Sequence, residues 1–381
     1  MDDSNFQFRH FICPPERGPR KTIHCRRGVR QGDPLSPLLF VLTADLLQSV
    51  INNAKESGHL HLPIPLLHTQ DFPILQYADD MLIILEACPN QLTHLQDLLS
   101  PFSISTGLKV NFSKYMLVPI NISDDQATAL ATSFGCELGK FPFTYLGLPM
   151  GLTKPKVIDF LPLVQRCERR LACTSSLLSQ AGRLEVTNSI FTALPMFFMC
   201  TLKLHKTVIK QVDKYRKHCL WRGSDINAKQ PPKAAWEMVC LPKKEGGLGV
   251  LNLRTQNDAL LLKHLHKFFN RYDIPWVNLV WELHYSNGSL PGTRMKGSFW
   301  WRDILKLLDS YKGMTSVTLG DGVSCLFWED LWLHRVPKQA FPELFSFARN
   351  PHISLSTVLV ADGPASLFHL PISQEAFQQL H

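Results

Sequence analysis

The sequence predicts an α+β fold for its first 140 residues, with helices packed on one face of a small antiparallel sheet. Apolar residues recur at helical spacing from residue 38 to about residue 54. Two apolar runs, residues 72–77 and 81–85, flank the tripeptide Ala-Asp-Asp and are typical of a β-hairpin. Residues 91–105 form a second amphipathic pattern. Helices that alternate with hairpin strands over short connections favour an α+β domain.

The order of elements can be followed from the N-terminus. Residues 22–29 are expected to form a short strand. The first helix should have Asp33 as its N-cap and Pro34 at its first helical position. The second helix should end before Gly107, which suits the left-handed position after a helix, and residues 109–118 should be extended.

A second region is expected over residues 141–224. Residues 141–151 are rich in glycine and aromatic residues and predict another hairpin, and residues 156–221 carry two or three helical patterns. The apolar run at residues 190–202 is too short to cross a bilayer and contains Pro195, so it favours a buried helix. We expect no membrane segment.

The composition changes again near residue 225. Pro231-Pro232 and a glycine-rich stretch at residues 246–249 are followed by a tryptophan-rich tail. The tryptophans of this tail are Trp276, Trp281, Trp300, Trp301, Trp328 and Trp332. The expected domains are therefore residues 1–140, 141–224 and 225–381.

The charge distribution favours a polyanionic partner. The formal net charge is +8, and residues 154–222 carry the whole excess, with 13 Lys and Arg against 4 Asp and Glu. Such a run is also typical of a solvated helix face.

The ten cysteines show no zinc-ligand spacing and the N-terminus shows no signal peptide. An intracellular protein, nuclear or cytoplasmic, is expected.

The sharpest local motif is Tyr77-Ala78-Asp79-Asp80 between the two apolar runs. Two adjacent acids between apolar strands are costly unless they face water or a cation. Carboxylates are ligands that Mg²⁺ prefers, and two such ions can stabilise the attacking hydroxyl and the leaving pyrophosphate of nucleotidyl transfer. The alternative is an ordinary turn, in which Asp is also favoured.

Neighbouring motifs decide between these two interpretations. Four blocks follow one another in the order and rough spacing found in non-LTR reverse transcriptases, at residues 28–40, 77–80, 107–114 and 145–151. The resemblance is to the plant-type (LINE-type) retrotransposon polyprotein and extends over about residues 22–335. It implies a partial right-hand palm at residues 1–140, a primer-grip hairpin and basic helical thumb at residues 141–224, and a C-terminal retroelement region.

The resemblance also implies roles for individual residues. Asp79 and its less stringent neighbour Asp80 would be catalytic and would bind Mg²⁺, with Mn²⁺ as the alternative ion, and Tyr77 would lie beside the primer end. Lys109 and Lys114 lie in the block that supplies a lysine near pyrophosphate, and the choice between them stays open. The nucleotide pocket and template segment would comprise Gln31, Gly32, Asp33 and Pro34. The primer grip would comprise Tyr145, Leu146, Gly147, Leu148 and Pro149.

The implied partners are an RNA template, a DNA primer or an RNA–DNA duplex, held through phosphate contacts of residues 154–222, together with deoxynucleotides. The family's fingers and its first catalytic-aspartate block, Phe-x-Lys-Ala-Phe-Asp, have no match in the sequence. We therefore expect a truncated reverse transcriptase that does not polymerise alone. A non-catalytic RNA- or DNA-binding module and a non-functional retroelement fragment are the alternatives, and the oligomeric state stays open.

Overall fold

The computed structural model describes residues 32–64, 71, 73–78, 80–108, 115–173, 178–223, 231–285, 291, 296–318, 320–332 and 335–380. The chain divides into two compact units. Unit 1 comprises Met1–Pro65 and Thr69–Phe141, and unit 2 comprises Leu66–His68 and Pro142–His381. The strand expected at residues 22–29 lies outside the described residues.

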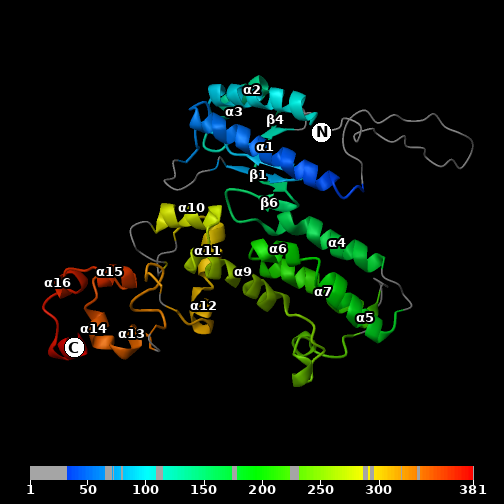
Figure 1. Ribbon diagram of the computed structural model, residues 1–381. Coiled ribbons are helices and arrows are strands. Elements are labelled where there is room, and N and C mark those ends of the chain that lie inside the picture. Colours follow the sequence, from blue (N-terminus) through cyan, green and yellow to red (C-terminus); the bar gives the residue numbers. More distant parts are fainter. Residues whose placement is uncertain are drawn as a thin grey trace, which may run out of the picture. The chain divides into compact units, whose positions relative to one another are not determined.

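Unit 1 combines three helices with short strands (Figure 1). The helices are α1 (Ser36–Glu56), α2 (Pro89–Thr106) and α3 (Asp124–Phe134). The strands are β1 (Ile74–Tyr77), β2 (Asp80–Ile83), β3 (Met116–Leu117) and β4 (Glu137–Leu138). Helices together with small sheets agree with the expected α+β class.

The start of α1 differs from the prediction. The N-cap position is Leu35 rather than Asp33, and the proline inside the first turn is Pro37 rather than Pro34. The Asp33 side chain accepts a hydrogen bond from the Leu35 amide, and its backbone carbonyl accepts one from Ser36. Asp33 therefore closes a turn just before the helix, because its side chain reaches only two residues ahead.

The hairpin β1–β2 presents one face to the helices of unit 1. The strands are antiparallel, with Ile74 opposite Ile83 and Tyr77 opposite Asp80. Ile74, Met81 and Ile83 pack against the core that α1, α2 and α3 build. Since successive side chains point to opposite faces, Tyr77 and Asp80 lie on the other face.

The single antiparallel sheet that the sequence predicted is not found among the described residues. Their strands form three two-stranded pairs, and β3 pairs with β4 in parallel. The reason is the position of α3, which connects β3 to β4, since a parallel pair needs a crossover connection. The end of α2 agrees with the prediction, because Gly107 adopts the left-handed conformation (φ 75°).

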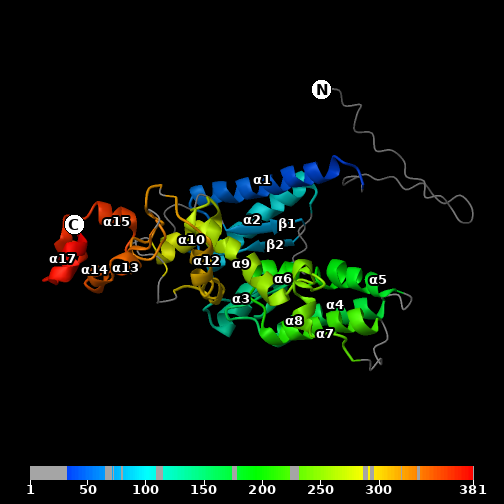
Figure 2. The same ribbon diagram turned by 90° about the horizontal axis from the view of Figure 1, so that it is seen from below.

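The described part of unit 2 starts with a hairpin. The rest of the unit is mostly helical (Figure 2). The hairpin strands are β5 (Phe143–Tyr145) and β6 (Leu148–Met150). The first group of helices comprises η3 (Val157–Phe160), α4 (Leu161–Ala172), α5 (Gln180–Val186), η4 (Thr187–Phe191), α6 (Met196–Thr201) and α7 (Lys206–Arg222). This is more than the two or three helices expected, because most of them are only one or two turns long.

The apolar run at residues 190–202 does not form one helix. The π-helical turn η4 ends at Phe191, and α6 begins after Pro195, which occupies its N-cap position. Proline lacks an N–H and restricts the residue before it, so it starts a helix more readily than it continues one. The run is nevertheless buried, since Phe191, Phe198 and Met199 lie in the core with α4 and α7.

The remaining helices of unit 2 follow in two groups along the chain, and the second group, orange to red, lies at the left of Figure 1. The first comprises α8 (Trp236–Val239), η5 (Lys243–Glu245), α9 (Leu253–Phe269), α10 (Pro275–His284), α11 (Phe299–Leu305) and α12 (Leu308–Met314). The second comprises α13 (Pro337–Ala340), α14 (Pro342–Ser346), α15 (Leu355–Leu359), α16 (Pro364–Leu367) and α17 (Gln374–Leu380). None of the described helices is both long and apolar enough to span a bilayer.

Tryptophans build the core of the α9–α12 group. Phe268 stacks on Trp281 with ring centroids 4.6 Å apart, and Trp301 lies 4.7 Å from Phe268. The Trp301 indole N–H donates to the Tyr285 hydroxyl at 3.1 Å. The tryptophan-rich tail noted in the sequence is therefore largely a packing feature.

Candidate nucleic-acid interface

The Tyr-Ala-Asp-Asp hairpin presents its polar residues to solvent. Tyr77 is 66% exposed, and Asp80 opposite it is exposed as well. Ala78 adopts a positive φ of 51°, which few residues other than Gly, Asn and Asp do readily. Such backbone strain is typical of functional turns. Asp79 itself lies outside the described residues.

The described residues supply only part of a metal site. Asp80 offers one exposed carboxylate next to the turn, and within the described ranges no group of three or more His, Cys, Asp or Glu could hold an ion. A carboxylate at this position suits Mg²⁺ chemically, since hard cations prefer oxygen ligands.

The other residues of the predicted nucleotide site fall partly within the described chain. Gly32 is exposed and has a φ of 83°, and Asp33 and Pro34 complete the turn before α1. Gln31, Lys109 and Lys114 lie outside the described residues. Gly32, Asp33 and Pro34 lie close to one another because they are consecutive in the chain.

The predicted primer-grip residues form the hairpin β5–β6. Tyr145 pairs with Leu148 and Thr144 with Pro149, so Leu146 and Gly147 make a two-residue turn. Both turn residues have positive φ, 50° and 79°, which is the backbone of the tight turn that matches strand twist. Leu148 packs against the core of α4, α6 and α7.

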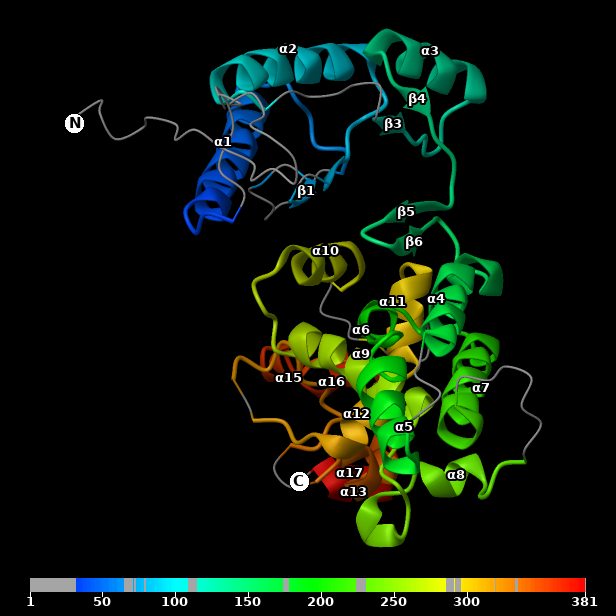
Figure 3. The same ribbon diagram turned by 90° about the vertical axis from the view of Figure 1, so that its right-hand side faces the viewer.

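A row of lysines runs along the exposed side of α7. Lys206, Lys210 and Lys214 are exposed and four residues apart, while Val208, Val212 and Cys219 face the core. Residues at this spacing lie about 6 Å apart along a helix axis. Helix α4 packs beside α7 (Figure 3). It exposes Arg166, so both helices contribute positive charge.

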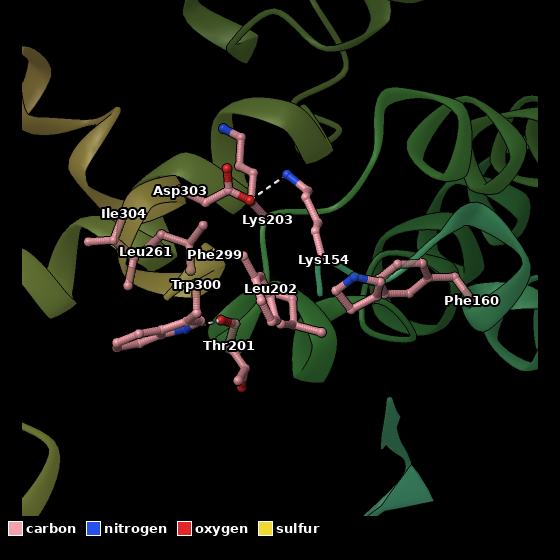
Figure 4. Close-up of a pocket in the computed structure, with 11 residues that line it drawn as sticks. Lys154, Phe160, Thr201, Leu202, Lys203, Leu261, Phe299, Trp300, Asp303 and Ile304 are labelled. Atoms are coloured by element: carbon pink, nitrogen blue, oxygen red, sulfur yellow. Dashed lines mark hydrogen bonds and ion pairs between the residues drawn. The ribbon is translucent and has the colours of Figure 1, made fainter. Parts of the chain in front are cut away.

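A second basic cluster surrounds a small recess in unit 2 (Figure 4). Lys154, Lys203 and Asp303 lie on one side of the recess, which Phe299 and Trp300 also line. Asp303 is only 7% exposed and accepts hydrogen bonds from Lys154 and, at 2.7 Å, from Lys306. Sequence reasoning missed this cluster, because its members come from distant parts of the chain.

The ionisation of Asp303 reflects the cations around it. Burial raises the pKa of this carboxyl, but the hydrogen bonds and charges of Lys154 and Lys306 outweigh burial and hold the pKa below its ordinary value. Lys203 forms an ion pair with Asp258. Burial, followed by the charge of Arg254, lowers the pKa of Lys203.

The half-buried His264 should make unit 2 sensitive to acid. Its Nε2 donates to the Cys200 carbonyl at 2.9 Å, and its Nδ1 is buried with no hydrogen-bond partner among the described residues. Burial lowers the pKa of His264. The hydrogen bond to the Cys200 carbonyl raises this pKa, and the charges of Lys263 and Lys267 lower it further. The unfolded chain therefore takes up a proton near pH 6.5, before the folded chain does, so stability falls as the pH drops below about 6.5.

The measurement is urea unfolding at pH 7.5 and pH 5.5, followed by tryptophan fluorescence. His264→Gln can keep the bond to the Cys200 carbonyl without titrating, so its loss of stability between the two pH values should be smaller than that of the wild type. His266→Gln, which removes an exposed histidine of the same helix, serves as the control. Equal acid sensitivity in wild type and His264→Gln would contradict the prediction.

Comparisons with known proteins agree with the sequence motifs. Residues 2–150 match the family model described as "Reverse transcriptase (RNA-dependent DNA polymerase)". This match covers the Tyr-Ala-Asp-Asp hairpin and ends with β6. Residues 2–150 are therefore similar to a reverse transcriptase domain.

Three known proteins are similar to parts of this chain. A ribonuclease H protein of Arabidopsis thaliana is 33% identical over 42% of this chain and 26% of its own length. The Pol polyprotein of the type-1 retrotransposable element R2 of Popillia japonica is 22% identical over 65% of this chain and 34% of its own length. An uncharacterized mitochondrial protein of Arabidopsis thaliana is 27% identical over 93% of its length.

The resemblance to non-LTR retrotransposon reverse transcriptases is thus confirmed. The chain spans about a quarter of the length of the Arabidopsis ribonuclease H protein and a third of the R2 polyprotein.

Proposed function

We propose that this polypeptide binds nucleic acid in the manner of a reverse transcriptase, with a partial palm at residues 1–140 and a primer grip and thumb at residues 141–224. Residues 225–381 would be the attached retroelement region. The observation that carries this proposal is the lysine row of α7, which lies outside the matched segment 2–150 and within the stretch 154–222 that holds the positive excess of the chain. The division of the chain after Phe141 supports the first boundary.

The lysine row suits a phosphate backbone. Lys206, Lys210 and Lys214 repeat at about 6 Å, which approaches the distance between successive phosphates in an extended strand. Ammonium groups on flexible stems contact phosphate oxygens without reading sequence. The affinity for an RNA–DNA duplex or an RNA template held here would therefore depend on the salt concentration and not on the nucleotide sequence.

Replacing Lys206, Lys210 and Lys214 with Gln should weaken binding of an RNA–DNA duplex and flatten its salt dependence. Each phosphate contact that is lost should reduce the slope of log K against log salt by about 0.9. Fluorescence anisotropy with a labelled hybrid measures this slope. The KCl concentration is varied from roughly 50 to 300 mM, a range over which the Debye length shortens about twofold.

The matched control removes the same charge elsewhere in unit 2. Lys233, Lys244 and Lys296 are exposed and lie outside the row, so their replacement with Gln tests net charge alone. Equal slopes for the two triple variants would contradict the assignment to α7.

The second part of the proposal assigns the residue roles that nucleotidyl transfer would use in the intact family, although this chain is not expected to polymerise alone. Asp79 and Asp80 would hold the catalytic Mg²⁺, which would supply activation of the primer hydroxyl and stabilisation of the leaving pyrophosphate. Tyr77, which lies opposite Asp80 on the same face of the hairpin, would contact the primer end. Lys109 or Lys114 would lie near the pyrophosphate, and residues 145–149 would hold the primer.

Primer extension on an RNA template tests this part. Following the sequence expectation, the chain should extend no more primer with Mg²⁺ or Mn²⁺ than Asp79→Asn does, because the block that carries the third carboxylate has no match in the sequence. Binding of the hybrid should be nearly equal in both proteins. Extension by the wild type that Asp79→Asn abolishes would overturn the expected inactivity and establish a polymerase.

The non-catalytic alternative is separated by the same two assays. Salt-dependent binding without extension would favour a nucleic-acid-binding module, and a chain that shows neither binding nor cooperative unfolding would favour a non-functional retroelement fragment. The burial of aromatic and aliphatic residues in unit 2 argues for cooperative unfolding.

A further inference from the structure

The recess in unit 2 holds more positive than negative charge. Four cations gather there, and two carboxylates face them. The cations are Lys154, Lys203, Arg254 and Lys306. The carboxylates are Asp258 and Asp303. The cluster therefore has two more positive charges than negative ones, because Lys154 and Lys306 share Asp303 while Lys203 pairs with Asp258.

The environment of Lys203 indicates that an anion would be stabilised here. Burial disfavours its charged form, and Arg254, Lys154 and Lys306 disfavour it further, while Asp303 acts in the opposite direction. A bound anion would relieve both effects, since an opposite charge nearby favours the charged form of a lysine. Phe299 and Trp300 line the same recess and limit the water that could screen it.

We propose that this recess is a second phosphate-binding site, which takes one phosphate group of a nucleic acid backbone or of a free polyphosphate. Lys154 and Lys203 line the recess, and two exposed cations act on it as rim residues: Lys306 donates to Asp303 of the recess, and the charge of Arg254 acts on Lys203. The backbone form of the proposal rests on the proposed function, whereas the free-polyphosphate form does not.

The arrangement of partners leaves the rim cations available. Asp303 is held by both Lys154 and Lys306, so it keeps one ion pair when Lys306 turns toward a ligand. The Lys306 side chain is 59% exposed, and Arg254 is exposed too. Contacts of this kind are charge-assisted, and Arg can hold phosphate oxygens in a bidentate way.

The site joins regions that are far apart in the sequence. Lys154 precedes α4, whereas Lys306 follows α11, and they meet on Asp303. Residues 225–381 would therefore contribute directly to ligand binding, which gives this retroelement region a role besides packing.

The test compares Arg254→Gln/Lys306→Gln with Lys233→Gln/Lys244→Gln, which removes the same charge from exposed positions away from the recess. The first arm measures hybrid binding against KCl. The second arm measures the thermal shift given by pyrophosphate against KCl of equal ionic strength. Lys306→Arg keeps the charge and should behave as the wild type in both arms, which separates a lost contact from a lost fold.

For a backbone phosphate, we expect the salt slope of the rim variant to fall by about 0.9, the value of one phosphate contact, while the control pair keeps the wild-type slope. For a free polyphosphate, pyrophosphate should raise the melting temperature of the wild type and of the control but not of the rim variant. Either result supports the site and identifies its ligand. The proposal is overturned if the rim variant matches the control pair in both arms. If the wild type binds no hybrid, the proposed function fails and the pyrophosphate arm alone decides the recess.

Discussion

Replacing Arg216 with Met should lower the free energy of unfolding of unit 2 by about 3–5 kcal/mol, which is the cost of breaking a buried ion pair by removing one partner. The Arg216 side chain is fully buried and joins three parts of the unit. Its guanidinium donates to Asp213 at 2.7 Å, and to the Thr192 hydroxyl and the Leu251 carbonyl at 2.8 Å each. It also lies 5.3 Å from the centre of the Trp236 ring.

The loss is large because the partners stay behind. Asp213 would keep a largely buried carboxylate without its cation, and the Leu251 carbonyl would lose its donor. Burial already raises the pKa of Asp213 although Arg216 acts to lower it, so the carboxylate depends on this arginine. Tryptophan fluorescence in urea measures the effect, since all eight tryptophans belong to unit 2.

Two further variants sharpen the result. Arg216→Met/Asp213→Asn should be more stable than Arg216→Met alone, because the second change removes the charge that the first leaves unpaired. Arg166→Met on the exposed side of α4 should stay within about 0.5 kcal/mol of the wild type. A double variant whose loss equals the sum of the two single losses would contradict the pairing.

Asn257→Ala should cost about 3–5 kcal/mol, because it leaves three buried backbone groups without a hydrogen-bond partner. The Asn257 side chain is fully buried on α9. Its oxygen accepts from the Leu204 amide at 2.9 Å, and its nitrogen donates to the Met199 and Leu202 carbonyls at 2.9 Å. It thereby ties α9 to the end of α6 and to the connection before α7.

Asn257→Asp tests the direction of these bonds. A carboxylate would still accept from Leu204 but would face two carbonyl oxygens, so the folded state should favour its protonated form. The variant should therefore be less destabilised, relative to the wild type, at pH 5 than at pH 7.5, as read by urea unfolding at both values. Gln256→Ala, at a half-buried neighbouring position, is the control and should cost much less. A pH-independent loss for Asn257→Asp would argue against the assigned amide orientation.

Several features of the chain could be read from the sequence because they depend on neighbouring residues. The hairpin around Tyr77 and Asp80 follows from two short apolar runs, and the turn at Leu146 and Gly147 from its glycine. The buried Arg216 also left a signal, since it follows Val208 and Val212 at helical spacing and so lies on the apolar face of α7. The spacing of Lys206, Lys210 and Lys214 was visible in the same way.

Other expectations were wrong where a local signal competed with packing. Asp33 looked like an N-cap, but the helix begins after Leu35 and the aspartate closes the preceding turn. The run at residues 190–202 looked like one helix, but Pro195 divides it. One antiparallel sheet was expected, but α3 places β3 and β4 in parallel.

The sequence by itself determined the resemblance of this protein to reverse transcriptases, its α+β class, and the residues proposed for chemistry, because ordered motifs and short-range periodicity are local properties. Only the tertiary structure brought Lys154 to Asp303 across 149 positions and Asn257 to the Met199 carbonyl across 58. Polar contacts between distant segments depend on how helices pack, since burial makes an unpaired group costly and the fold must supply its partner. The phosphate recess and the two buried hydrogen-bond centres therefore came from packing, whereas the hairpin and the lysine row came from the order of residues.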